Sequence, residues 1–239
     1  MRPLRFLWLG TVPYATAWGL QRRLATARAA GELDADAVLL LEHPPVFTMG
    51  RNGEPGHLRG GPERLRGLGA EYLEVDRGGS VTFHGPGQLV AYPIVRLAEV
   101  LPVPGHPGQG DVLRYVRALE EAMLATAAAV GVTAGLRPPY TGVWVGEEKL
   151  GAIGVKLSRG VTLHGLAINA TTDLSWFAEV VPCGISDGGV TSLERLGASG
   201  WSPERLALDL ARHLAAALGL VAVPADAGLR ELAGTAAAA

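Results

Sequence analysis

The only cysteine of the 239-residue sequence, Cys183, lies between a proline and a glycine in the segment VVPCGISDGGVTS. Proline restrains the incoming backbone and glycine permits unusual dihedral angles, so a loop of this composition can present a side chain to a ligand. A free cysteine is more often a small buried hydrophobe. Here the apolar run WFAEVV ends before Cys183 and a polar turn follows it. This favours a thiolate nucleophile over core packing, with both interpretations open from the residues alone.

Lys149 and Lys156 are the only lysines among 21 basic residues. An arginine does not lose its proton in a protein, so a retained lysine suits a role in proton transfer, although chance retention is equally consistent. The two are seven residues apart, and on a regular strand they face opposite sides. We expect Lys149, beside the small residues GAIG, to face a site, and Lys156 to be a solvated charge. A Cys/Lys pair suits acyl transfer, in which a thiolate attacks a thioester and an amine handles protons.

A glycine-rich segment from Arg77 to Gln88, RGGSVTFHGPGQ, allows backbone to approach a ligand closely. It lacks the spacing of a phosphate-binding loop, and no G-x-G-x-x-G opens a helix here. We predict a loop, in which His84 could equally cap a backbone carbonyl. His164, within a strand pattern, is expected to be a satisfied polar core residue. The histidines and the cysteine show no H-x-x-x-H or C-x-x-C pairing, which argues against a metal site.

The composition is that of a globular chain, with 48% hydrophobic and 18% charged residues. A net charge of −2 argues against a nucleic-acid partner. A single cysteine cannot form an internal disulfide, which indicates a reducing compartment. No apolar run reaches the ~18 residues of a membrane span, and the N-terminal run is too short for a signal peptide. We therefore expect a cytoplasmic protein without a membrane partner.

Hydrophobic periodicity and capping residues predict three long helices: Tyr14–Ala30, Asp111–Val130, and one from Ser202 to about Gly219. Three late strands joined by short turns predict an antiparallel meander: Gly142–Gly146, Lys149–Ser158 and Val161–Ala170. Strands and helices do not alternate regularly. We therefore predict an α+β fold with a mixed, largely antiparallel sheet flanked by helices, in one domain of residues 1–239 whose tail from about residue 225 is frayed.

Four segments spread from residue 43 to 193 together resemble the lipoyl(octanoyl) transferase family. They are HPPVFTMGR (43–51), RGGSVTFHGPGQLVAYPI (77–94), KLGAIGVKLSRGVTLHGLAINA (149–170) and VPCGISDGGVTSL (181–193). Enzymes of this family move an octanoyl group from acyl carrier protein to a lysine of lipoyl domains. The resemblance implies a fold shared with biotin and lipoate protein ligases, and no cofactor.

The resemblance also implies roles for particular residues. Cys183 takes the position of the acyl-accepting cysteine and Lys149 that of the catalytic lysine. The implied substrate-binding residues are Arg77, Gly78, Gly79, Ser80, Val81, Thr82, Phe83, His84, Ala152, Ile153, Gly154, Gly165, Leu166 and Ala167. The implied donor is octanoyl-acyl carrier protein, and the acceptors are lipoyl domains of 2-oxoacid dehydrogenase complexes and the glycine cleavage H protein.

Two alternatives stay open at this point. An ATP-dependent lipoate or biotin ligase of the same fold would form an acyl-adenylate and would need no nucleophilic cysteine. A non-catalytic module that binds lipoyl domains or acyl carrier protein would use Cys183 only for packing. The cysteine and the lack of a recognisable ATP loop favour the transferase over the ligase.

Overall fold

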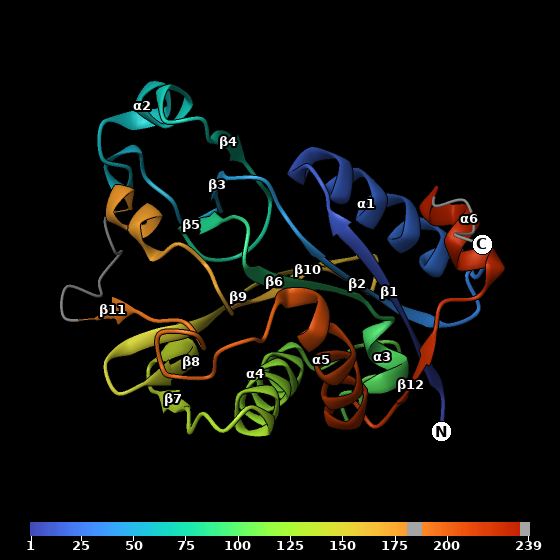
Figure 1. Ribbon diagram of the computed structural model, residues 1–239. Coiled ribbons are helices and arrows are strands. Elements are labelled where there is room, and N and C mark those ends of the chain that lie inside the picture. Colours follow the sequence, from blue (N-terminus) through green and yellow to red (C-terminus); the bar gives the residue numbers. More distant parts are fainter. Residues whose placement is uncertain (181–187, 235–239) are drawn as a thin grey trace.

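The computed structural model describes residues 1–180 and 188–234 (Figure 1). A nine-stranded sheet forms its centre in the order β12-β1-β2-β6-β10-β9-β8-β7, with β11 beside β9. Its strands are β1 (Pro3–Thr11), β2 (Asp36–Glu42), β6 (Gln88–Ile94), β7 (Gly135–Arg137), β8 (Tyr140–Val145), β9 (Glu148–Ser158), β10 (Val161–Asn169), β11 (Gly189–Val190) and β12 (Val221–Pro224). A smaller sheet, in the order β4-β3-β5, consists of β3 (Val46–Met49), β4 (Glu71–Glu74) and β5 (Val81–His84).

Helices cover both faces of the large sheet. The helices are α1 (Tyr14–Ala30), α2 (Gly61–Gly67), α3 (Leu97–Val100), α4 (Val112–Ala129), α5 (Pro203–Ala217) and α6 (Ala227–Ala233), with 3-10 turns η1 (Pro55–His57) and η2 (Leu174–Glu179). Helices α4 and α5 pack on one face and α1 and α6 on the other, each pair over its own apolar core (Figure 1). Among residues 1–180 and 188–234, no helix is both long enough and apolar enough to cross a membrane.

The predicted sheet is confirmed. Strands β12, β1 and β2 run parallel to one another, whereas the strands from β2 onward pair antiparallel in the order β2, β6, β10, β9, β8 and β7. The late strands β8, β9 and β10 form the expected meander, because two-residue turns let each strand return beside the one before it. The fold is therefore a mixed, largely antiparallel sheet flanked by helices.

Local capping explains the helix ends. The chain leaves α1 at Gly31, whose φ of 81° is a left-handed conformation that costs glycine little. Asp111 begins α4 by accepting a hydrogen bond from the Arg114 backbone N–H at 3.0 Å, and Ser202 caps α5 in the same way. The three predicted helices are thus confirmed to within a residue or two.

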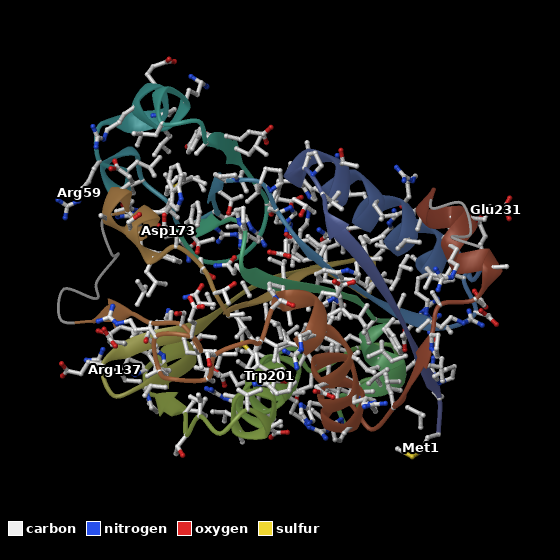
Figure 2. All side chains as sticks on the ribbon, in the orientation of Figure 1. Met1, Arg59, Arg137, Asp173, Trp201 and Glu231 are labelled. Carbon is white, nitrogen blue, oxygen red and sulfur yellow. The ribbon has the colours of Figure 1, made fainter. Side chains whose placement is uncertain are left out.

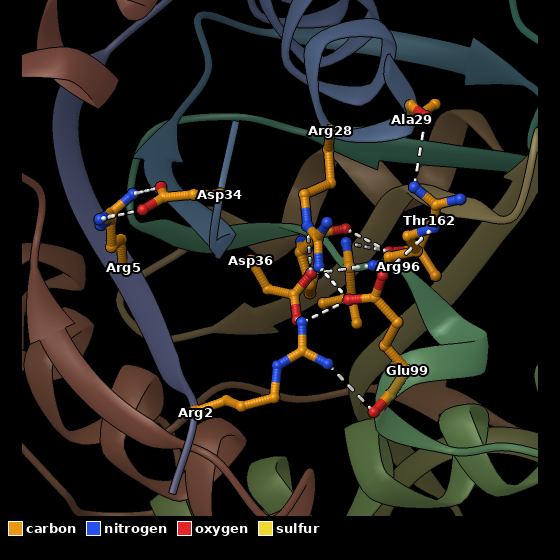
Figure 3. Close-up of polar contacts among 11 residues, drawn as sticks. Arg2, Arg5, Arg28, Ala29, Asp34, Asp36, Arg96, Glu99 and Thr162 are labelled. Carbon is orange, nitrogen blue, oxygen red and sulfur yellow. Dashed lines mark hydrogen bonds and ion pairs between the residues drawn. The ribbon is translucent and has the colours of Figure 1, made fainter. Parts of the chain in front are cut away.

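A cluster of charged residues ties α1 to the start of strand β2 and to α3 (Figure 3). Arg28 on α1 contacts the fully buried Asp36 of β2 at 2.9 Å and Glu99 of α3 at 2.6 Å. Arg2 contacts Glu99 as well, at 2.5 Å. A buried carboxylate is stable only when cations and N–H donors surround it, so this cluster holds α1 and α3 in place.

Two expectations about the chain are wrong. The segment 77–88 is not a loop throughout, because its residues 81–84 form β5, which pairs with β3 so that Phe83 lies opposite Phe47. The tail from residue 225 is not frayed over its described part. Helix α6 begins at the Asp226 cap and buries Leu229 completely against α1, so apolar packing holds it.

Candidate active site

A cavity of about 470 Å³ lies between the large sheet and the smaller one. Its floor consists of β9 and β10, where small residues such as Ala152, Gly154 and Ala167 leave room above the strands. Strand β5 and the residues before it form the opposite wall, and Phe177 of η2 contributes to the rim. The volume falls within the range of small-molecule sites, about 300–1,000 Å³.

The structure brings together most of the residues expected to bind substrate. The cavity is lined by Arg77, Gly79, Ser80, Val81, Thr82, His84, Ala152, Ile153, Gly154, Gly165, Leu166 and Ala167. Gly78 and Phe83 lie outside this lining. The Gly78 backbone N–H instead donates to the Val155 carbonyl at 2.9 Å, which attaches the segment to β9. Phe83 packs into the small-sheet core, 5.1 Å from Phe47 between ring centroids.

Cys183 lies outside the described residues. The described chain ends at Val180 before this segment and resumes at Gly188, and both of these residues line the cavity. From Gly188 the chain continues into β11, where Val190 pairs with Lys149 of β9. The segment that carries the cysteine therefore leaves and rejoins the described structure at the cavity wall.

Lys149 lines the cavity beside Trp144 of β8. Its Nζ lies over the indole ring, 4.7 Å from the centroid, and Arg137, labelled in Figure 2, lies over the same ring at 5.2 Å. Burial lowers the pKa of Lys149 from its usual 10.5, because the charged form loses solvation. A half-buried amine with a lowered pKa gives up its proton more readily than a solvated lysine, which suits a proton carrier.

A β-bulge in β9 decides which way Lys149 faces. Gly151 pairs with Val143 and Lys149 with the next residue, Trp144, so Leu150 is an extra residue in β9. Leu150 is buried in the core under α4, and a Cβ on Gly151 would also point there, 2.8 Å from Met123 Sδ. Both bulge residues therefore face α4, which leaves Lys149 on the cavity side.

Lys149 lines the cavity as expected, but the bulge makes the expectation of opposite faces for the two lysines wrong. Beyond it, Ala152, Gly154 and Lys156 also face the cavity side, so the two lysines share one face of β9. Lys156 is not a solvated charge either, because only 27% of its side chain is exposed and its Nζ contacts Asp76. The seven-residue spacing predicts opposite faces only on a regular strand.

His164 has both ring nitrogens engaged at the floor of the cavity. Its Nε2 lies 2.8 Å from Asp76 Oδ1, and its Nδ1 lies 3.2 Å from the Tyr14 hydroxyl. Burial lowers the pKa of His164 to about 4, so the ring is neutral, donates from Nε2 and accepts the Tyr14 O–H at Nδ1. The expectation of a satisfied polar residue is confirmed for this histidine.

The backbone at His164 is strained. Its φ of 57° is a left-handed conformation that is uncommon for a residue other than glycine, and it occurs here in the middle of β10. The Gln21 side chain of α1 holds this conformation by accepting the His164 backbone N–H at 2.8 Å. The strain turns the imidazole toward Tyr14 and Asp76.

The sequence interpretation missed several residues that line or support the cavity. They are Tyr14, Asp76, Gln88, Tyr92, Trp144 and Asn169. Asp76 directly precedes the glycine-rich segment and Gln88 is its last residue, so the motif gave a signal for both. Tyr14, Tyr92 and Trp144 come from elements whose contribution depends on tertiary packing. Within the described part of the chain, no group of three or more histidine, cysteine or acidic side chains is placed to hold a metal ion.

Comparison with known proteins places the chain in a family. A model of the lipoyl protein ligase A/B catalytic domain matches residues 13–215. The chain therefore belongs to the family of lipoyl protein ligase A/B catalytic domains. A protein of Rubrobacter xylanophilus named octanoyltransferase is 52% identical over 188 residues, which are 78% of this chain and 80% of that protein. Within the family, the chain is thus an octanoyltransferase, an acyltransferase.

Solved structures show the same fold at low sequence identity. A bipartite lipoate protein ligase from Thermoplasma acidophilum, described with its E2 lipoyl domain, superposes with a TM-score of 0.70 at 18% identity and covers 98% of this chain and 91% of its own. A biotin protein ligase from Aquifex aeolicus, in complex with biotin and ATP, superposes with a TM-score of 0.51 at 16% identity, over 90% of this chain and 70% of its own. The expected fold of biotin and lipoate protein ligases is confirmed.

Proposed function

We propose that this chain moves an octanoyl group from octanoyl-acyl carrier protein to a lysine of lipoyl domains through a thioester on Cys183. The acceptors are the lipoyl domains of 2-oxoacid dehydrogenase complexes and the H protein of glycine cleavage. One observation carries the proposal: a half-buried lysine with a lowered pKa lines the same cavity as Val180 and Gly188, which lie on either side of the Cys183 segment.

The reaction has two halves. In the first, the Cys183 thiolate attacks the thioester carbonyl of the donor, a new C–S bond forms, and the bond to the carrier thiol breaks. In the second, the amine of the acceptor lysine attacks this acyl-enzyme, an amide C–N bond forms, and the C–S bond to Cys183 breaks. Lys149 accepts the proton of the thiol and later that of the attacking amine, and it returns protons to the departing thiols.

The cavity floor suits an octanoyl chain. Ala152, Gly154 and Ala167 present almost no side-chain volume, and Val81 and Phe177 add apolar surface across from them. Each methylene that leaves water for such a site contributes about 0.8 kcal/mol, so an eight-carbon chain gains substantial binding energy. A thioester donor is already activated, and the reaction therefore needs no nucleotide.

Intact-mass spectrometry tests the proposal. Incubation with octanoyl-acyl carrier protein alone, without nucleotide, should leave one octanoyl group on the peptide that contains Cys183, and hydroxylamine should release it. Addition of a lipoyl domain should discharge it onto the domain. Cys183→Ala should abolish both the adduct and turnover. A strict need for ATP would place the activity with the ligases, and an unmodified Cys183 during productive turnover would remove the covalent intermediate.

A further inference from the structure

A chain of hydrogen bonds leads from Thr191, which follows β11, to His84 in β5. The Thr191 carbonyl accepts from Asn169 Nδ2 at 2.9 Å, and Asn169 Oδ1 accepts from Gln88 Nε2 at 2.9 Å. Gln88 Oε1 lies 2.7 Å from His84 Nδ1. The Thr191 backbone N–H also donates to the Lys149 carbonyl at 3.1 Å, so the chain starts beside the catalytic lysine.

The direction of every bond in this chain follows from its first member. A backbone carbonyl can only accept, so Asn169 must point its amide N–H₂ at Thr191 and its oxygen at Gln88. Gln88 must then donate to Asn169, which turns its oxygen toward His84. His84 must therefore donate from Nδ1. The neutral imidazole that results carries no proton on Nε2, which is an acceptor.

His84 differs in this respect from the other histidines around the cavity. His43 uses Nδ1 on the Val12 carbonyl at 2.6 Å and Nε2 on the Tyr92 hydroxyl at 2.7 Å, and His164 is also engaged at both nitrogens. His84 Nε2 makes no hydrogen bond with any residue that the structure describes, and the side chain lines the cavity. The buried hydrogen bonds from Thr191 to His84 thus leave the Nε2 lone pair of His84 at the cavity wall.

We propose that His84 is a catalytic residue whose Nε2 accepts a hydrogen bond from the amine of the acceptor lysine and orients that amine for attack on the octanoyl carbonyl. The inference rests on the proposed function. In the second half of the reaction the reacting groups are the acyl thioester on the enzyme, which has no N–H or O–H donor, and the acceptor amine, which carries N–H in each of its protonation states. The amine is therefore the reacting group that can satisfy this lone pair.

His84 orients the amine while Lys149 takes its proton. Burial lowers the pKa of His84 to about 3, and the neighbouring His43, Arg77 and His164 add to this, with Tyr14 stacked on the ring at 5.9 Å. A ring of such low basicity stays neutral and keeps its lone pair for the hydrogen bond. Lys149 is the more basic group and binds the proton that the amine loses.

A variant can separate this role from packing. His84→Asn keeps an N–H for Gln88 but has no atom in place of Nε2. We expect kcat/KM for the lipoyl domain to fall by about 10- to 100-fold, which is the effect of a lost hydrogen bond to a polar or charged donor. Exchange of octanoyl between the donor and free pantetheine involves no acceptor amine, so its rate should be unchanged. His106→Asn, in an exposed loop, is the matched control.

Each result of this experiment decides something. Equal losses in both reactions would show that His84 only supports the fold and would overturn the inference. If the wild-type enzyme transfers to the lipoyl domain but shows no thiol exchange, the thioester intermediate of the proposed function fails. The comparison of lipoyl-domain kinetics between wild type and His84→Asn still decides the role of His84 in that case.

Nitrogen NMR of the histidine-labelled wild-type enzyme tests the same point without a substitution. His84 should show a protonated Nδ1 and an unprotonated Nε2. Addition of a lipoyl domain should shift the Nε2 resonance toward a hydrogen-bonded value, and a domain whose acceptor lysine is replaced by methionine should leave it in place. The opposite tautomer, or the same shift with both domains, would refute the proposal.

Discussion

Replacing Lys149 by methionine removes the amine but keeps an unbranched side chain in the space beside Trp144. A positioned proton carrier contributes about 10²–10⁴-fold to a reaction rate, so turnover should fall by that factor, which equals about 3–5 kcal/mol of transition-state stabilisation. Lys149→Arg sharpens the test, because arginine keeps a positive charge over the indole ring but does not release its proton. We expect both variants to be equally impaired in initial rates of octanoyl transfer.

Lys149→Met should also stabilise the folded protein. The pKa of Lys149 in the folded protein lies below 10.5, so the unfolded chain binds more protons between these two values and stability rises with pH across that window. Below the folded pKa the cost of desolvating the charge is present in full, offset in part by the contact with Trp144, worth about 0.5–2 kcal/mol. Lys149→Met should therefore raise the free energy of urea unfolding at pH 7.

Two results would refute this reasoning. If Lys149→Arg keeps more than about a tenth of wild-type turnover, the lysine acts by its charge and not by proton transfer. If Lys149→Met is less stable than wild type at pH 7, the burial of the amine does not oppose folding, and the lowered pKa has no support.

Three further substitutions test the described contacts, two of them with a matched control. Lys156→Ala should keep nearly all turnover, because its ion pair is partly exposed and worth at most about 1 kcal/mol, and a loss as large as at Lys149 would assign it a part in the chemistry. Gly165→Ala should destabilise the protein by about 1–3 kcal/mol in urea, because the new Cβ would lie 2.1 Å from a carbonyl oxygen of β6. Gly19→Ala, with open space around it in α1, should instead stabilise by about 0.5–1 kcal/mol. Leu229→Ala should cost about 2–5 kcal/mol and the 40% exposed Leu232→Ala less than about 0.5 kcal/mol, and equal losses would show that α6 does not pack as described.

Features that depend on neighbouring residues along the chain could be predicted from the sequence. The bounds of α1 follow from a local apolar period and from Gly31, and the capping residues Asp111 and Ser202 set the starts of α4 and α5. The meander follows in the same way, because short turns allow only one return path. The motifs that carry the resemblance are also local, so the family and most of the cavity lining could be predicted.

Features that depend on partners distant in sequence could not. Strand β5 exists because β3, some 35 residues earlier, offers an edge for pairing, and helix α6 is ordered because Leu229 finds a core made by α1. The direction in which His84 donates depends on Thr191, more than 100 residues away. No local pattern records such contacts.

The sequence by itself determined the three long helices, the meander, the order of the motifs and the pairing of one cysteine with two candidate lysines. Only the tertiary structure decided the orientation of the side chains. Strand periodicity predicts opposite faces for Lys149 and Lys156, but one inserted residue between them, Leu150, places both on the cavity side. The physical reason is that a bulge is set by pairing with the neighbouring strand and by packing under α4, and neither appears in the spacing of residues along the chain.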